Sequence, residues 1–306
     1  MPTTPTGLNA KIKYAIKVAC TWGAAGAIAF VLSAVPTLAD AGITGFVVGK
    51  AAESSKEAAT DYLKERLLKE QEPTVELPPA GSFAGCSHLF PRGTVINIRD
   101  ISRQWLPTAL CFKNFAVLHS GVSKTPLVVV ERLNREILES ARNEGRTNQF
   151  YPDPRLPRGR RAELQDYVNS NLDRGHMASA ADQPDAQAME QSFALSNMIP
   201  QDPENNRKGA WFKAEVDTRK YARRAQGDVF VFSGPLFRGH LTTIGAGKVW
   251  VPSHLYKLVV DASTGRSWAF IIQNTADARL EPPMNYPAFV RETGWNLLSH
   301  GSSASR

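Results

Sequence analysis

Short hydrophobic runs dominate the chain from residue 111 onward. They are rich in Val, Ile, Phe and Trp and are separated by Gly, Pro and Asn, which is typical of β-strands. The runs occupy residues 115–119, 127–130, 230–232, 250–251, 258–260 and 268–272. Ser120-Gly121, between the first two runs, is a turn signal. The pattern therefore predicts a sheet whose strands are mainly antiparallel.

A helical pattern extends from Asn206 to Gln226, and Gly227 would end it. Its inward positions recur at i, i+3 and i+4 spacing: Trp211, Ala214, Thr218, Ala222 and Ala225. The preceding stretch, 193–201, is interpreted as a strand that leads into an asparagine-rich loop. Together these elements predict an α+β domain over residues 81–300, with a mainly antiparallel central sheet flanked by helices.

The N-terminal region follows neither pattern. Lys11, Lys13 and Lys17 precede an uncharged stretch at 18–39 that is long enough to cross a bilayer. It ends at Ala39-Asp40-Ala41, which is typical of a small-residue cleavage site. Residues 1–41 are interpreted as a signal peptide or a membrane anchor, with a buried helix as the alternative. We therefore expect an exported protein, periplasmic or anchored with its domain facing outward, and secreted if the segment is cleaved.

Residues 42–80 are predicted to connect this segment to the domain. A glycine-rich apolar stretch at 42–49 precedes a charged helix at 51–72, whose sparse apolar positions indicate a solvated stalk. Pro78-Pro79-Ala80-Gly81 is a linker signal. At the other end, residues 301–306 form a short tail.

Composition is that of an ordinary globular protein and excludes disorder of the whole chain. Of the 306 residues, 42% are hydrophobic and 21% are charged. The net charge of +7 favours a polyanionic partner, although solubility alone would account for a charge of this size.

Cys86 and Cys111 lie within the predicted domain and form either a disulfide or two buried thiols. Neither is in a C-x-x-C pattern, so a structural zinc site has little support.

The most reactive group of residues is Asp173-Arg174-Gly175-His176. An imidazole titrates near neutral pH, so His176 can take a proton from an attacking water. The guanidinium of Arg174 suits phosphate oxygens, and Gly175 allows close backbone approach. Asp173 would orient the ring or brace the turn. The alternative is an arginine–aspartate pair at a turn beside a surface histidine.

A second group of polar residues lies on the predicted helix. The amide oxygen of Asn206 suits Mg²⁺, which keeps most of its waters and takes few protein ligands. Glu215 could orient those waters, and Arg219 follows one turn later. The alternatives are that Asn206 caps the helix and that Glu215 and Arg219 form an ordinary surface salt bridge.

These two groups, on strand, strand and helix, resemble the ββα-metal site of the DNA/RNA non-specific endonuclease family. The likeness is carried by D-R-G-H-M-A at 173–178, L-S-N-x-x-P-Q at 195–201, Asn206, and W-x-x-x-E-x-x-x-R at 211–219. It extends to F-A-V-L-H-S-G at 115–121 and V-P-S-H-L-Y-K at 251–257, and it covers about residue 83 to about 295. In one departure, four residues separate Asn206 from Trp211, where the family usually has three.

The resemblance implies a Mg²⁺-dependent, sugar-non-specific endonuclease that hydrolyses DNA and RNA to 5′-phosphate ends. His176 would be the general base, and Asn206 would be the direct protein ligand of the metal, for which Mn²⁺ can substitute. Glu215 would hold metal-bound water. The other residues that the resemblance assigns to the catalytic site are Arg174 and Arg219, on the phosphate, and Asp173, which would support the turn.

A basic cluster before the motif, with one lysine after it, is predicted to contact backbone phosphates without reading bases. These candidate substrate-binding residues are Arg155, Arg158, Arg161 and Lys208. The alternative is a solvated Pro/Arg loop. DNA and RNA are the expected partners, and membrane attachment through the N-terminal segment, a homodimer and an inhibitor protein are left open. Two other functions also stay open: a phosphodiesterase with a more restricted substrate, and a catalytically weak nucleic-acid-binding or uptake protein.

Overall fold

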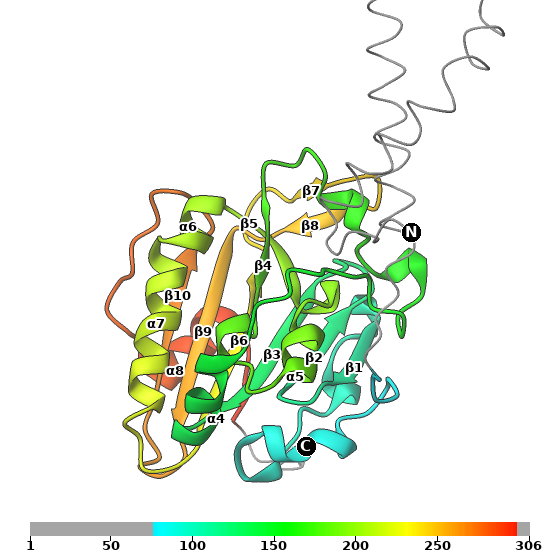
Figure 1. Cartoon of the computed structure of the whole chain (residues 1–306). Helices are drawn as coiled ribbons and strands as arrows, with labels where there is room; N and C mark the ends of the chain where they lie inside the picture. Colours follow the sequence, from blue (N-terminus) through cyan, green and yellow to red (C-terminus); the bar gives the residue numbers. More distant parts are fainter. Residues whose placement is uncertain (1–75, 299–306) are drawn as a thin grey trace, which may run out of the picture. The chain divides into compact units, whose positions relative to one another are not determined.

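Residues 76–298 are described by a computed structural model of the chain (Figure 1). The predicted apolar segment, the glycine-rich stretch and the charged helix lie outside the described residues, as does the C-terminal tail. The domain predicted to begin at residue 81 is described as far as residue 298.

The central element is a six-stranded sheet with the strand order β1-β2-β3-β6-β9-β10, in which every neighbouring pair is antiparallel. Its strands are β1 (Pro107–Cys111), β2 (Phe115–Ser120), β3 (Pro126–Leu133), β6 (Val229–Leu236), β9 (His254–Asp261) and β10 (Ser267–Gln273). The predicted antiparallel α+β class is therefore confirmed. One run, 250–251, lies elsewhere, because β8 (Val249–Val251) pairs with β7 (Thr242–Ile244) in a separate sheet.

Helices cover both faces of the central sheet (Figure 1). Because successive strand residues point to opposite faces, Val231 packs towards α4 and α7 while its neighbour Phe232 packs towards α8. The α5 helix also packs on the α7 side, through Met189. The helices are α4 (Arg135–Ser140), α5 (Ala186–Ser192), α6 (Pro203–Arg207), α7 (Ala210–Ala222) and α8 (Tyr286–Thr293).

Short 3-10 turns connect these elements. Those before the sheet pack with α8, and those after β3 shape the loops around the small sheet that carries the predicted site. They are Ala84–Leu89, Pro91–Gly93, Ile98–Asp100, Arg103–Trp105, Ala141–Asn143, Arg158–Arg160, Leu164–Tyr167, Ala180–Asp182 and Leu195–Asn197.

That small sheet consists of β4 (Asp173–His176) paired antiparallel with β5 (Met198–Gln201). Gly175 is required there, because a Cβ at this position would lie 2.0 Å from the Oε1 of Gln201 on the neighbouring strand. The strand predicted over 193–201 is only partly correct. Its first part turns instead, since Asn197 donates its amide to the carbonyls of Ala178 and Ser192.

The single helix predicted from Asn206 to Gln226 is wrong, because the structure has two helices there. Asp202 caps α6 by accepting from Glu204 N at 2.9 Å, and Pro203 is its first residue, so the helix begins before Asn206. The chain then leaves helical geometry at Lys208 and Gly209. Asn206 therefore lies in the last turn of α6 and is not a helix N-cap.

A disulfide joins Cys86 to Cys111, with 5.8 Å between the Cα atoms. The structure thus selects the disulfide over two free thiols. The bond links the turn at Ala84–Leu89 to the end of β1, at the edge of the central sheet.

Candidate active site

His176 is buried at the end of β4. The residue is 8% exposed, and its Nε2 has no hydrogen-bond partner among the described residues. Burial, followed by the positive charges of Arg146 and Arg174, lowers the pKa of His176 to about 3. The ring is therefore neutral near neutral pH, and a ring nitrogen can accept a proton.

Two aromatic rings and two arginines surround this imidazole. The ring centroids of Phe193 and Phe150 lie 4.9 and 5.7 Å from that of His176. Arg174 stacks on Phe150 at 4.2 Å and Arg146 on Phe193 at 5.1 Å, measured from the guanidinium carbon to the ring centroid. Stacking of this kind leaves the N–H edge of a guanidinium available to an anion.

Arg146 is a candidate that the sequence did not single out. The positive charge of Arg146 contributes to the lowered pKa of His176. Burial lowers the pKa of Arg146 itself, and the negative charge of Glu215 partly opposes this effect. Arg146 thus interacts with residues of both β4 and α7. In the sequence it is one arginine in a polar loop, and only the stacking partner Phe193, far along the chain, distinguishes it.

Asn206 is oriented by Asp173. Its Nδ2 donates to Asp173 Oδ2 at 2.9 Å, and Arg207 pairs with the other carboxylate oxygen at 2.5 Å. A carboxylate can only accept, so the amide nitrogen must face it and the amide oxygen is left for another partner. Asp173 therefore links β4 to α6, beyond supporting its own turn.

The neighbouring Asn205 has no such freedom. It is fully buried, its Nδ2 donates to Gln273 O at 2.7 Å, and its Oδ1 accepts from Trp211 N at 2.9 Å. Both ends of the amide are occupied by backbone groups of β10 and α7. Asn205 therefore holds the fold together, and Asn206 is the better candidate ligand.

Glu215 and Arg219 lie on one flank of α7, with 3.9 Å between Oε2 and Nη2. Their side chains are 11% and 13% exposed, so they are not an ordinary surface pair. The shorter contact of Arg219 is with Asp182, at 2.5 Å between Nε and Oδ1. Burial raises the pKa of Glu215 to about 7, against the opposing positive charges of Lys257 and Arg219.

Two further charged residues lie under α7, on the sheet. Lys257 is 2% exposed, and its Nζ donates to Ser233 Oγ at 2.8 Å and lies 4.4 Å from the ring centroid of Trp211. Glu131 is also 2% exposed, and its pKa is raised mainly by burial and next by the negative charge of Asp182. In the sequence, Lys257 was included only as the last residue of a motif and was given no role, and Glu131 was not named. The available signal was a charged residue in an otherwise hydrophobic strand.

The side chains around His176 limit which metal fits. Across residues 76–298 there is no group of three or more His, Cys, Asp or Glu side chains that could hold a metal ion. Zinc prefers such a group, whereas Mg²⁺ binds through few protein ligands and retains water. The free amide oxygen of Asn206, with Glu215 on α7, suits a hydrated Mg²⁺ ion.

Contacts tie these residues into one site. Asp173 on β4 binds Asn206, while Ser179 and Asp182 in the segment after β4 bind Arg219. The contacts thus join β4, the segment after it, α6 and α7, which carry a neutral imidazole, guanidinium groups and a candidate cation ligand, and groups of these kinds can take part in phosphodiester hydrolysis.

Comparison with known proteins agrees with this chemistry. Residues 100–296 match the family model described as DNA/RNA non-specific endonuclease, which is more than half of the chain. The chain belongs to this family.

Several relatives of this family member are nucleases by name. Nuclease EXOG, mitochondrial, of Xenopus laevis is 34% identical over 76% of this chain and 64% of its own length. The mitochondrial nuclease of Saccharomyces cerevisiae is 34% identical over 61% of this chain and 64% of its own length. A crystal structure of the EndoG/EndoGI complex matches with a TM-score of 0.53 and 26% identity, covering 61% of this chain and 83% of that one. The chain thus spans less than two thirds of the curated relatives.

The prediction that this endonuclease-family chain is exported is wrong. The relatives from Xenopus laevis, Saccharomyces cerevisiae and Schizosaccharomyces pombe are named as mitochondrial nucleases, not exported ones. Within residues 76–298, no helix is both long enough and apolar enough to span a membrane. The uncharged N-terminal stretch that prompted the prediction lies outside the described residues.

Two of the arginines predicted to bind substrate, Arg155 and Arg161, form ion pairs and hydrogen bonds within the protein. The Arg155 side chain is 8% exposed and pairs with the fully buried Asp153 at 2.7 Å. Arg161, 15% exposed, bonds to Glu163 at 2.9 Å and to the carbonyls of Asp153 and Leu156. Both guanidinium groups thus have partners within the fold, and a contact of Arg155 or Arg161 with substrate stays a prediction.

The other two predicted contacts remain on the surface. Arg158 is exposed at the start of its 3-10 turn. The Lys208 side chain is 71% exposed and lies 3.1 Å from Glu204, a pair that solvent weakens. Both can meet a phosphate, and their role stays a prediction.

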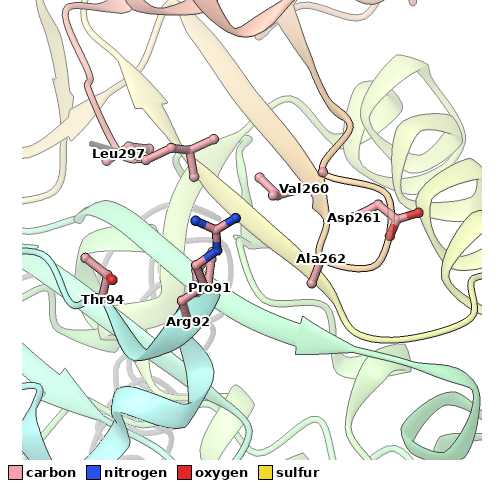
Figure 2. Close-up of a pocket in the computed structure, with 9 residues that line it drawn as sticks. Pro91, Arg92, Thr94, Val260, Asp261, Ala262 and Leu297 are labelled. Atoms are coloured by element: carbon pink, nitrogen blue, oxygen red, sulfur yellow. The ribbon is translucent and has the colours of Figure 1, made fainter. Parts of the chain in front are cut away.

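A separate pocket of about 200 Å³ lies near the end of β9 (Figure 2). Figure 2 shows the Arg92 guanidinium extending towards Leu297, while the carboxylate of Asp261 points away from the pocket. That carboxylate accepts from Tyr221 and Ser263. The lining includes none of the predicted site residues, so we assign no catalytic role to it.

Proposed function

We propose that this chain is a divalent-metal-dependent endonuclease that hydrolyses phosphodiester bonds in both DNA and RNA. The observation that carries the proposal is the buried, neutral His176, whose unpartnered Nε2 lies among the arginines of β4 and the loop before it. Membership of the family and the nuclease names of the relatives support the same reaction.

In the proposed reaction, His176 accepts a proton from the attacking water. His176 is unprotonated at neutral pH and can therefore accept the proton. A bound phosphate would offset the charges of Arg146 and Arg174 and raise the pKa of His176 towards the working pH, at which a general base is most effective. Arg174 and Arg146 neutralise the phosphate, and Arg219 stabilises the charge that develops as the water attacks. Asp173 keeps the Asn206 amide in its orientation.

Asn206 would hold the metal through its amide oxygen, and Glu215 would contact the ion's hydration shell. Mg²⁺ is the proposed ion, with Mn²⁺ as a substitute, because both accept hard oxygen ligands. When bound, the ion would stabilise the negative charge on the phosphate and on the leaving 3′-oxygen. Water would form the new P–O bond as the P–O3′ bond breaks, which would leave a 5′-phosphate and a 3′-hydroxyl.

Phosphate contacts account for the absence of sugar selection in the proposal. The groups assigned to the substrate would meet phosphates, which DNA and RNA have in common, and would contact neither the bases nor the 2′ position by which the two sugars differ. The matched structure is of an EndoG/EndoGI complex and concerns EndoG inhibition, which supports keeping an inhibitor protein among the candidate partners. A homodimer stays a prediction.

The test uses the full chain with plasmid DNA and a long RNA. We expect both to be cut in Mg²⁺ and spared in EDTA, and His176→Ala to reduce the rate by about 10²–10⁴-fold. His240→Ala is the matched control, because His240 is exposed and outside the site. The products should be ligated without prior phosphorylation if their 5′ ends carry phosphate.

Each rival function has its own outcome in this experiment. Hydrolysis of small phosphodiesters without cleavage of either polymer would favour a restricted phosphodiesterase. Binding of DNA without cleavage in Mg²⁺ or Mn²⁺ would favour a nucleic-acid-binding protein. Equal rates for His176→Ala and His240→Ala would reject His176 as the base.

A further inference from the structure

A buried ion pair between Asp182 and Arg219 connects the segment after β4 to α7. Asp182 ends the 3-10 turn Ala180–Asp182, and its side chain is 5% exposed. Its Oδ1 accepts from the Nε of Arg219 at 2.5 Å, and Ser179 Oγ lies 3.3 Å from Arg219 Nη2. Asp182 and Ser179 thus bind the same edge of the Arg219 guanidinium.

This contact fixes the orientation of Arg219, because a guanidinium is planar and its donors have fixed directions. A hydrogen bond at Nε together with one at Nη2 defines both the plane and the rotation of the group. Glu215, at 3.9 Å, is a looser partner on the same nitrogen. The donors of Nη1 face away from the Asp182 edge and are those left for a substrate phosphate.

Asp182 is itself anchored to the central sheet. Its carbonyl accepts from the Nδ2 of Asn114, a buried residue between β1 and β2, at 3.3 Å, and its N–H donates to Ser179 O at 3.1 Å. The carboxylate therefore has a defined position before Arg219 binds it. Asp185, three residues on, shows the contrast: it pairs with Lys113 on the surface, with side chains 38% and 47% exposed.

We infer that Asp182 is a positioning residue of the proposed nuclease, which holds the Arg219 guanidinium in the orientation that meets the phosphate. The inference rests on the proposed function. Asp182 touches neither substrate nor metal in this scheme and acts only through Arg219. Its loss should therefore slow the chemical step more than it weakens substrate binding, because Arg219 acts on charge that develops during the reaction.

The first test compares Asp182→Asn with Asp185→Asn in steady-state cleavage of DNA. Misplacing a group by about 1 Å can cost about 10²-fold in rate, so Asp182→Asn should lower kcat by about 10- to 100-fold and change KM by less than about threefold. Asp185→Asn should match the wild type, because asparagine caps α5 as aspartate does.

The second test asks whether Asp182 acts through Arg219. In the Arg219→Ala background, Asp182→Asn should change kcat by less than about twofold, since the group that it orients is gone. A structural role for Asp182 would lower kcat in both backgrounds alike. Asp182→Glu provides a further variant that keeps the charge and moves the carboxylate by about 1.5 Å. Asp182→Glu should have a lower kcat than the wild type at the same melting temperature. This variant therefore tests the positioning role even if Asp182→Asn does not fold.

The inference is overturned if Asp182→Asn or the folded Asp182→Glu cleaves at the wild-type kcat, or if the loss is equal with and without Arg219. A wild-type chain that never cuts nucleic acid in Mg²⁺ or Mn²⁺ would instead refute the proposed function. The two failures are therefore distinguishable.

Discussion

Substituting Arg155 with alanine should destabilise the domain without changing its affinity for DNA. The guanidinium makes two hydrogen bonds to Asp153, at 2.9 and 2.7 Å, and one to Cys111 O at 2.8 Å. It also stacks on Phe112 at 4.2 Å. The carboxylate of Asp153 is fully buried and would keep only Ser196 as a side-chain partner.

The magnitude follows from that burial. Removing one partner of a buried ion pair costs about 3–5 kcal/mol, because the remaining charge has no compensation. Near the middle of this range, a domain of this size would melt about 8–16 °C lower, at about 2–4 °C per kcal/mol. A loss of this size is a large part of the stability of a typical domain.

Urea unfolding of Arg155→Ala, followed by circular dichroism, measures the loss. DNA binding is measured beside it by titration in the His176→Ala background, at several salt concentrations. Arg158→Ala is the matched control: it should stay within about 0.5 kcal/mol of the parent in stability and reduce the salt slope of binding by about 1. The reasoning fails if Arg155→Ala is as stable as Arg158→Ala, or if the folded variant loses affinity to the same extent.

Other predictions concern the metal ligand, the disulfide and pH. Asn206→Ala should lower Mg²⁺-dependent cleavage by at least about tenfold with only a small drop in melting temperature, because Arg207 still binds Asp173. Asn205→Ala should cost about 2–4 kcal/mol because two buried backbone groups lose their partner; a reversed pattern in paired activity and melting assays would exchange their roles. Cys86→Ser opens a loop with a sequence separation of 25 residues and should cost about 3 kcal/mol by urea unfolding, and an unchanged midpoint would contradict this. In EDTA, the free energy of unfolding should fall as the pH is lowered from 6.5 towards 3, by up to about 1.4 kcal/mol per pH unit. The cause is His176, which becomes protonated in the unfolded chain over this range but stays neutral in the folded chain. Glu215, with its pKa raised to about 7, acts with the opposite sign: the folded chain holds a proton that the unfolded one releases, so stability falls as pH rises from 4.5 to 7. Unfolding curves of His176→Ala and Glu215→Gln should each lack the corresponding slope, and curves parallel to the wild type would refute the assignment.

The sequence predicted the central sheet well because its strands are specified locally. Runs such as 127–130 combine β-branched residues with flanking turn signals, and both effects act over a few residues. The spacing of His176, Asn206 and Glu215 likewise pointed to one site through a family pattern. The boundary of α6 was missed, although Asp202-Pro203 is itself a helix-start signal.

The remaining differences concern information that the sequence does not hold locally. An arginine–aspartate pair has the same sequence whether it is buried or exposed to solvent. Arg155 was therefore interpreted as a phosphate contact, although Asp153 lies two residues before it. Arg146 acquires its candidate role only through stacking on Phe193, which the fold brings close. For both residues the deciding fact, the burial of the Arg155–Asp153 pair and the position of Phe193 beside Arg146, comes from the folded structure.

The break at Lys208 and Gly209 changes how the one-residue departure from the family pattern should be understood. On a continuous helix, one added residue would rotate Glu215 by about 100° relative to Asn206. Here the helix is broken instead: α6 is fastened to β4 through Asn206 and Asp173 and to β10 through Asn205, and the Oδ1 of Asn205 also accepts from Trp211 N at the start of α7. The additional residue lies between Asn206 and Trp211, the stretch in which helical geometry is already interrupted. Counting residues per turn across this stretch therefore does not give the angle between Asn206 and Glu215, and the bonds of Asn205 and Asn206 set the position of α6 instead.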